Sequence, residues 1–409
     1  MEVIHSRCAG LDVHQKTVVA CVRLAVKKKV VHEVRTFGTT TSELLALSDW
    51  LASHQCTHVA MESTGIYWKP LWHVLEGSFD LVLANAMHIR NIPGRKSDVN
   101  DATWISDLLA HGLIRSSFVP PARIQELRDL TRSRKQLVRE VAQHIQRVQK
   151  VLEDANVKLT EILSDILGKS GRAIIEAIIA GEQDPQILAS LACGNRLKAT
   201  REEFVEALHG RVTPHHRFLL KLHLGQIDAL ESAVRELEAR VGDALSPFHE
   251  SACLLTTIPG VSDIVARVII AEVGVDMGRF PTSGHLISWA GLCPGMNESA
   301  GKRFPSRIRA GAPWLKSTLV QAAWRAIQTK GSYLRAQFLR LKSRRGPKKA
   351  VIAVAASMLT AVYHMLKHQV PYQDLGGDYF DRRDKAKVAK RLIKKLKDLG
   401  LRVEVCPAA

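Results

Sequence analysis

The order of apolar patterns in the first 118 residues is the feature that most limits the fold of this chain. Short runs rich in β-branched residues alternate there with segments of helical periodicity. The five predicted strands are Arg7–Val13, Thr17–Leu24, Val30–Thr36, Thr57–Met61 and Leu81–Asn85, and the predicted helices between them are Thr41–Ser53 and Trp68–Glu76. Three strands that can form a meander are thus followed by helix, strand, helix, strand and helix.

That order is typical of a ribonuclease-H-like α/β domain. Pro120 and Pro121 then mark a boundary. Beyond them, Ile124–Leu159 and Phe218–Leu245 keep apolar residues at helical spacing, which predicts two long amphipathic helices. The two helices can pack as a coiled-coil pair that serves oligomerisation. An ordinary helical bundle that joins two domains explains the same pattern.

The rest of the chain is predicted to be helical, so the fold class is α/β followed by all-α. Residues 254–274 read as helix, Pro-Gly turn and helix, and further helices are predicted at Pro313–Ile327, Lys349–Lys367 and the basic tail Asp381–Leu399. The predicted domains are a ribonuclease-H-like domain at 1–120, a helical coiled-coil region at 121–250, a helical C-terminal domain at 251–375 and a basic tail at 376–409.

The charge of the chain points to a polyanionic partner. Lys and Arg number 58 against 40 Asp and Glu, which gives a net charge of +18. Composition alone does not separate nucleic acid from an anionic membrane surface. The distribution favours nucleic acid, because Ser299–Gln373 contains no Asp or Glu. Such a segment would repel itself unless a phosphate backbone lay across it.

Cysteine usage and hydropathy indicate a reduced, aqueous compartment. The seven cysteines never form a CxxC pair, so neither a zinc knuckle nor a disulfide framework is indicated. Met1–Cys8 has no apolar signal-peptide core, and the longest apolar run, Ala350–Tyr363, is shorter than the roughly 20 residues that span a bilayer. We expect no membrane association and a cytoplasmic location.

Four carboxylates fall where a ribonuclease-H-like sheet would carry an active site. Asp12 lies near the end of the first predicted strand and Glu62 closes the fourth, whereas Asp98 and Asp101 are three residues apart at the start of a helix. Four acids brought together require a hard cation, and oxygen ligands select Mg²⁺ or Mn²⁺. Two such ions about 4 Å apart stabilise both oxygens of phosphodiester cleavage.

Each acid also has a structural explanation. Asp98 with Asp101 resembles a capping box, and acids in a first turn suit the helix dipole. Asp12 and Glu62 equally fit turn residues or salt-bridge partners. The metal interpretation therefore depends on all four acids falling at the expected places of one fold.

Ser299 lies in a Pro/Gly-rich loop beside cations. Ala300 and Gly301 are small enough to let a DNA backbone approach. A serine hydroxyl is a poor nucleophile unaided, so it needs activation and a stabilised transition state. Nearby arginines can stabilise the transition state, and a metal–carboxylate cluster can activate the hydroxyl. The alternative is a serine that only contacts phosphate or forms a turn.

The segment that begins at Ile258-Pro-Gly-Val resembles a helix-hairpin-helix, in which hairpin amides and a helix N-terminus grip phosphates. Pro-Gly turns between helices also occur in plain bundles. Lys385–Lys397 is either a nucleic-acid clamp or a solvated helix face. The predicted nucleic-acid contacts are Lys302, Arg303, Arg307, Arg309, Lys316, Gly260 and Ser262.

Five motifs stand in order along residues 7–375: Gly10-Leu-Asp-Val-His-Gln-Lys, Met61-Glu-Ser-Thr-Gly-Ile-Tyr-Trp, Lys96-Ser-Asp-Val-Asn-Asp-Ala, Ile258-Pro-Gly-Val and Asn297-Glu-Ser-Ala-Gly-Lys-Arg. Together they resemble the insertion-sequence-one-ten family of transposases, also called bridge-RNA-guided recombinases. The motif residues show no departure from the family pattern, and the tail after Asp374 lies outside the resemblance.

The resemblance implies a RuvC-like DEDD domain that holds Mg²⁺ through Asp12, Glu62, Asp98 and Asp101. It also implies a transposase domain whose Ser299 attacks DNA to give a covalent phosphoserine. Its implied partners are donor and target double-stranded DNA, a structured guide RNA that pairs with both, and further copies of the chain, as homodimers that assemble into tetramers. Part of the positive charge then serves RNA, which is commonly held through its shape and phosphates. The implied location is the bacterial cytoplasm, on the nucleoid.

Three functions therefore compete. The first is an RNA-guided recombinase that cuts through Ser299 and rejoins the strands, with sequence read by base pairing. The second is a RuvC-like, structure-specific nuclease in which water attacks and Ser299 only contacts phosphate. The third is a non-catalytic architectural or RNA-binding protein whose acids are helix caps and surface charges.

Overall fold

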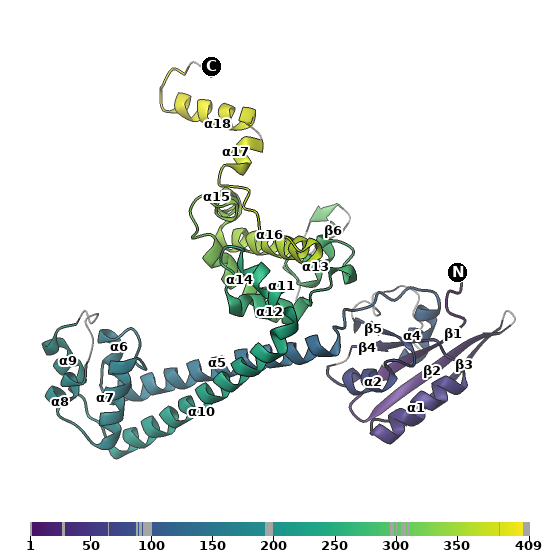
Figure 1. Ribbon diagram of the computed structural model, residues 1–409, viewed down its shortest axis with the longest axis horizontal. Coiled ribbons are helices and arrows are strands. Elements are labelled where there is room, and N and C mark those ends of the chain that lie inside the picture. Colours follow the sequence, from purple (N-terminus) through teal and green to yellow (C-terminus); the bar gives the residue numbers. More distant parts are fainter. Residues whose placement is uncertain are drawn as a thin grey trace. The chain divides into compact units, whose positions relative to one another are not determined.

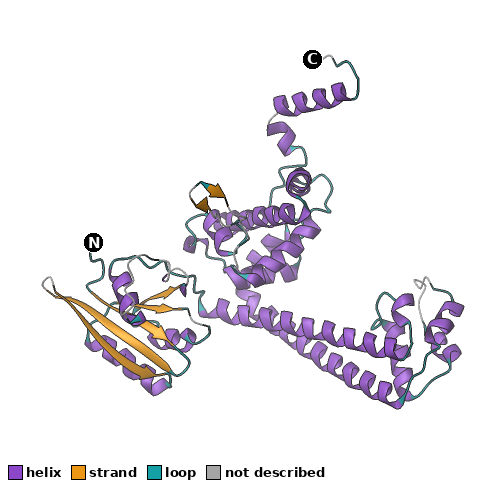
Figure 2. Ribbon diagram, turned by 180° about the vertical axis from the view of Figure 1, so that it is seen from behind, coloured by secondary structure: helices purple, strands orange, loops and turns teal. Residues whose placement is uncertain are grey.

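The computed structural model describes residues 2–26, 29–63, 65–86, 89, 92, 100–192, 199–294, 298–299, 301–303, 308, 311–383 and 385–403. The chain divides into two compact units, Met1–Val119 and Pro120–Ala409 (Figure 1). Strands are concentrated in the first unit, and the second is built almost entirely of helices (Figure 2). The four-part domain division drawn from the sequence stays a prediction.

The first unit is built on a five-stranded mixed sheet with the order β3-β2-β1-β4-β5. The first three strands are antiparallel, and β4 and β5 continue the sheet parallel to β1. This confirms the predicted mixed α/β domain, and it is consistent with a ribonuclease-H-like fold. The strands are β1 Arg7–Val13, β2 Thr17–Val26, β3 Lys29–Gly38, β4 His58–Glu62 and β5 Asp80–Ala84.

Helices cover both faces of this sheet. Because side chains alternate along a strand, Ala9 and Leu11 of β1 enter the core on one face, and Cys8 enters the core on the other. The first core includes Leu47 of α1 and Leu71 of α2, and the second includes Ile105 of α4. The helices are α1 Thr41–Ser53, α2 Trp68–Leu75 and α4 Asp101–Ala110.

The second unit begins with two long helices, α5 (Ala122–Asp154) and α10 (Pro214–Leu245), that pack against each other (Figure 1). Both helices are predicted by the sequence, but with different ends. The fold ends α5 five residues earlier, and Asn156 just beyond it takes a left-handed φ of 57°. It begins α10 four residues earlier, because Thr213 caps the helix and Pro214 occupies its first position.

Four short helices that the sequence pattern does not indicate connect α5 to α10. They share a core with both long helices, in which Ile174, Phe204 and Leu220 are buried. They are α6 Leu159–Ile162, α7 Lys169–Ala180, α8 Pro185–Ser190 and α9 Arg201–Leu208.

A helical bundle follows α10, with α16 in its core. By length and composition α16 could cross a membrane, although the sequence pattern alone predicts a shorter apolar run. Its most apolar stretch is 56% buried inside the protein, as in the core helix of a globular domain. The elements are η1 Ser246–Phe248, α11 His249–Thr256, α12 Asp263–Val273, η2 Met277–Arg279, α13 Ser283–Trp289, β6 Glu298–Ser299, β7 Lys302–Arg303, α14 Pro313–Ala326, α15 Tyr333–Arg345, α16 Pro347–His368, α17 Tyr379–Arg383 and α18 Lys385–Asp398.

Candidate functional site

Two of the predicted acids occupy the ends of neighbouring parallel strands. Leu11 of β1 lies opposite Met61 of β4, and the next residues are Asp12 and Glu62. Because β1 and β4 are parallel, their carboxyl ends meet at the same edge of the sheet. The backbone therefore brings Asp12 and Glu62 to one edge, from positions 50 residues apart in the chain.

Helix α4 brings a third acid toward that edge. A Cβ atom on Gly10 would lie only 2.3 Å from the carbonyl oxygen of Ala102, so the backbones of α4 and β1 are in direct contact there. The Cys8 thiol donates to the carbonyl of Ser106 at 3.6 Å, so α4 runs back along β1 and its first turn lies toward the Asp12 end. Asp101 is the first residue of α4.

The start of α4 differs from the prediction. Asn100 is the N-cap, and its side-chain oxygen accepts from the amide of Ala102 at 3.0 Å. Asp101 is therefore the first residue of the helix, and its predicted place on one helical face with Asp98 stays a prediction. Asp98 lies outside the described residues.

The carboxylate of Asp12 is paired with a neighbouring histidine. His14 Nε2 lies 3.1 Å from Asp12 Oδ2, and the side chain of Asp12 is 17% exposed. Within the part of the chain that the structure describes, no three His, Cys, Asp or Glu side chains are grouped closely enough to hold a metal ion. The four-acid site stays a prediction, with Asp12 and Glu62 at one edge of the sheet and the start of α4 toward that edge.

A second polar cluster fixes α4 to the sheet. The buried Arg23 of β2 donates through Nε to Asp107 Oδ1 of α4 at 2.8 Å, and His32 of β3 approaches the same oxygen at 3.0 Å. These contacts hold α4, the helix that begins with Asp101, against β2 and β3, and the bond from Arg23 is charge-assisted. Sequence reasoning missed Asp107, although it lies six residues after Asp101 in the same short helix.

The Ser299 segment forms a small hairpin. The backbone of Ser299 in β6 pairs with Lys302 in β7, and Gly301 between them has a φ of 73°, which favours glycine. Lys302 is exposed. Arg307 and Arg309 lie outside the described residues. The hairpin thus sets Ser299 directly opposite a predicted phosphate-binding lysine.

The turn between α11 and α12 has a packing role. A Cβ atom on Gly260 would lie 2.4 Å from the carbonyl oxygen of Ala322 and 2.6 Å from the amide nitrogen of Ala326, so this turn lies against the backbone of α14. Ser262 is the exposed N-cap of α12, and its side chain makes no capping hydrogen bond. Lys316 is half-buried in α14. Phosphate contacts by Gly260, Ser262 and Lys316 stay predictions.

Helix α5 carries a set of cations that sequence reasoning missed. Arg132 donates from Nε and Nη2 to both oxygens of Glu272 at 2.8 Å, and Glu272 is only 1% exposed. Arg128 adds bonds to the backbone carbonyls of Ala271 and Glu272. Further along, Lys135 reaches α14. These basic residues recur at spacings of three and four residues, so they are neighbours on the helix surface. The spacing is present in the sequence, but the pattern of apolar residues does not reveal it.

Two family models match this chain, and both describe transposases. A DEDD transposase model for IS110 matches residues 9–157, and a model described as "Transposase IS116/IS110/IS902 family" matches residues 252–339. The two matches together cover more than half of the chain. The chain belongs to the IS110 family of transposases.

Two curated relatives come from Streptomyces coelicolor. An "Insertion element IS110 uncharacterized 43.6 kDa protein" is 30% identical over 152 residues, which is 36% of either chain. A "Mini-circle putative transposase for IS117" is 34% identical over 84 residues, 20% of either chain. The chain therefore aligns with only about a third or less of these relatives' lengths.

Proposed function

We propose that this protein is a DNA transposase that cuts and rejoins DNA through Ser299. The observation that carries the proposal is the placement of Asp12, Glu62 and Asp101 toward one edge of a single sheet. Family membership supports the same function, since both matched models describe transposases. The cationic, acid-free segment that begins at Ser299 suits a DNA substrate.

The proposed reaction is a pair of transesterifications. The Ser299 hydroxyl loses its proton to a base and forms an oxygen–phosphorus bond, while the bond from phosphorus to a deoxyribose oxygen breaks and that oxygen takes up a proton. A DNA hydroxyl then attacks the phosphoserine, which joins the new strand and restores Ser299. The number of phosphate ester bonds is conserved, so rejoining needs no external energy source. Lys302, directly opposite Ser299 in the hairpin, is proposed to hold the phosphate.

The acids are proposed to hold Mg²⁺ or Mn²⁺. Asp12, Glu62, Asp98 and Asp101 supply only oxygen ligands, and this donor set suits hard divalent ions. When bound, such an ion neutralises charge that develops on the phosphate oxygens.

The proposed partners follow from the family. A structured guide RNA would pair with donor and target DNA, and α5 with α10 would act as a coiled coil that forms homodimers and then tetramers. The α11–α12 turn would act as a helix-hairpin-helix that holds phosphates. We propose the bacterial cytoplasm, on the nucleoid, as the site of action.

Trapping of a covalent adduct tests the proposal. Protein incubated with labelled DNA and Mg²⁺ is expected to give a band on denaturing gels that protease removes and chelation prevents. Ser299→Ala is expected to abolish the band, whereas Ser343→Ala, an exposed serine of the same acid-free segment, keeps it.

Equal adduct from Ser299→Ala and the parent would exclude Ser299 as the nucleophile. Free 5′-phosphate ends without adduct, lost in Asp12→Ala but kept in Ser299→Ala, would identify a nuclease that uses water. Sequencing of RNA recovered with the purified protein tests the guide, and a discrete structured RNA is expected.

A further inference from the structure

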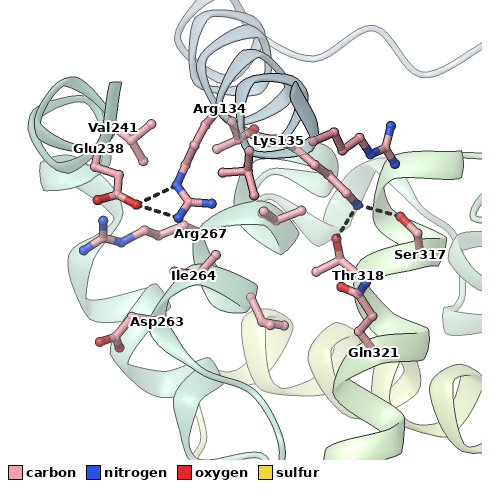
Figure 3. A pocket seen from close by; sticks show the side chains of 15 residues that line it. Arg134, Lys135, Glu238, Val241, Asp263, Ile264, Arg267, Ser317, Thr318 and Gln321 are labelled. Atoms are coloured by element: carbon pink, nitrogen blue, oxygen red, sulfur yellow. Dashed lines mark hydrogen bonds and ion pairs between the residues drawn. The ribbon is translucent and has the colours of Figure 1, made fainter. Parts of the chain in front are cut away.

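A pocket of about 520 Å³ lies between α5, α10, α12 and α14, within the second unit (Figure 3). Its walls include Lys135 and Arg139 of α5, Arg267 of α12, and Ser317 and Thr318 of α14. Among the predicted nucleic-acid contacts that the structure describes, Lys302, Lys316, Gly260 and Ser262 do not line it.

Among the described residues, hydroxyl groups and not an acid hold Lys135 in this pocket. Its Nζ donates to Ser317 Oγ at 2.7 Å and approaches Thr318 Oγ1 at 3.4 Å (Figure 3). Both hydroxyls donate their own protons to the carbonyl of Trp314 at 3.0 Å, so they face Lys135 as acceptors. An ammonium group has three protons. One proton of Lys135 therefore has no hydrogen-bond acceptor among the described residues, although the Trp314 ring centroid lies 5.6 Å from Nζ.

The charge of Lys135 is only partly compensated by the described residues. Burial first and Arg139 second lower the pKa of Lys135, while Glu272 raises it only in part. Glu272 is itself engaged at both oxygens by Arg132. A half-buried cation in this position gains from an anion that supplies the missing charge.

The remaining charges of the pocket are also mostly positive. Glu238 is engaged by Arg134, whose Nε lies 2.8 Å from its carboxylate (Figure 3). Arg139 and Arg267 have no acidic partner among the described residues, and the guanidinium of Arg139 lies 5.3 Å from the ring centroid of Trp314. Among the described lining residues, Asp263 is the only acid that has no described cation partner. The described lining therefore keeps a net positive charge.

We propose that this pocket binds a sugar-phosphate unit of a nucleic-acid backbone, with the phosphate against Lys135 and Arg139. Val138 and Ile264, which are 42% and 48% exposed, offer apolar contact to the sugar, which an inorganic anion would not use. The site deepens the proposed function, on which it rests for its ligand class. It contacts phosphate and sugar and so adds affinity without reading sequence.

The test measures binding of the full-length protein to a random-sequence DNA duplex and to a structured RNA hairpin over a range of salt. Lys135→Met removes the charge and keeps the length of the side chain. It is expected to weaken binding about tenfold and to lower the duplex salt slope by about 0.9. Lys150→Met removes the same charge from an exposed position of α5, and it is expected to change binding by less than twofold.

A second variant leaves Lys135 in place. Ser317→Asp sets a carboxylate beside Lys135 and is expected to weaken binding as Lys135→Met does, whereas Ser343→Asp adds the same charge to an exposed position and has little effect. Unfolding curves of all four variants show whether each is folded.

A loss for DNA alone, for RNA alone, or for both supports the site and identifies its ligand. If Lys135→Met and Ser317→Asp are both folded and bind DNA and RNA with the affinity and salt slope of the parent, the proposed site is overturned. Failure of the proposed function is distinguishable, because it removes the Ser299 adduct without altering these binding curves.

Discussion

Glu272 shows how one buried acid holds an interface between helices. It is 1% exposed and accepts both bonds of Arg132, so its removal leaves cationic groups of α5 without a partner. We expect Glu272→Gln to lower the free energy of unfolding by roughly 3 kcal/mol, because breaking one side of a buried ion pair is costly. Urea unfolding followed by circular dichroism measures the change.

Glu238→Gln is the matched control for that measurement. Glu238 of α10 pairs with Arg134 of α5, the helix that also carries Arg132, but the side chain of Glu238 is 43% exposed. Exposed pairs contribute about 0 to 1 kcal/mol. An equal loss in both variants would contradict the view that burial of Glu272 decides the effect.

At the residue scale, the positions of Asp12 and Glu62 near the ends of β1 and β4 could be predicted, because the apolar pattern marks both strands. Their role as metal ligands stays a prediction. The environment of Lys135 does not follow, since it depends on hydroxyls about 180 residues further along the chain. The partners of a half-buried lysine such as Lys135 are set by tertiary structure.

The contact between α4 and β1 is the element-scale feature that positions Asp101. Gly10→Ala is expected to destabilise the protein by about 2 kcal/mol or more, because the new methyl group would meet backbone 2.3 Å away and overpacking forces backbone shifts. Thermal unfolding measures the change. Gly225→Ala, inside α10 with open space around it, is expected to stabilise by about 0.5 to 1 kcal/mol.

The packing of α5 on α10 is expected to weaken in acid. Burial, then His144 and Arg147, lower the pKa of His223 below its usual 6.5. The unfolded chain then binds the proton more readily than the folded one, so stability present above pH 6.5 is lost as the pH falls towards the lower, folded pKa. Unfolding free energies at pH 7.5 and 5.5 test this direction.

His223→Gln is expected to reduce that pH dependence, and His215→Gln, at an exposed position of the same helix, is expected to keep it. An unchanged dependence in His223→Gln would assign the effect to other groups.

Element types were predictable where periodicity is strong, and element ends were not. All five strands and both long helices follow from their patterns. α15 was missed because five of its 13 residues are Arg or Lys and it buries only Leu334 and Phe338. The short helices α6–α9 were missed because each is stabilised by a shared core and not by its own pattern.

At the scale of the whole molecule, the basic tail is expected to add affinity without adding stability. α17 is held by stacking of Phe380 on Tyr333, at 5.3 Å between ring centroids, but Leu392 and Leu396 of α18 remain 50% and 39% exposed. Deletion of residues 384–409 is expected to weaken binding of random-sequence DNA at least tenfold and to leave the melting temperature within about 2 °C.

Fluorescence anisotropy and thermal unfolding test this pair of outcomes together. A truncated protein with parent affinity would show that the lysines of α18 are only a solvated face. A lower melting temperature would show that the tail belongs to the folded core.

Helix α5 spans 33 residues without a glycine or proline between Ala122 and Asp154, which corresponds to about 50 Å of uninterrupted backbone hydrogen bonding. Its first half is clamped to α12 through Glu272, and its last turns are buried among α6–α9. A helix without glycine or proline in its interior has no such site for a sharp kink. We therefore expect any bending of this part of the chain to occur where the helix ends, at Pro120 and Pro121 or at Ala155 and Asn156. Substitutions that stiffen these two short stretches are expected to restrict such bending and to leave α5 intact.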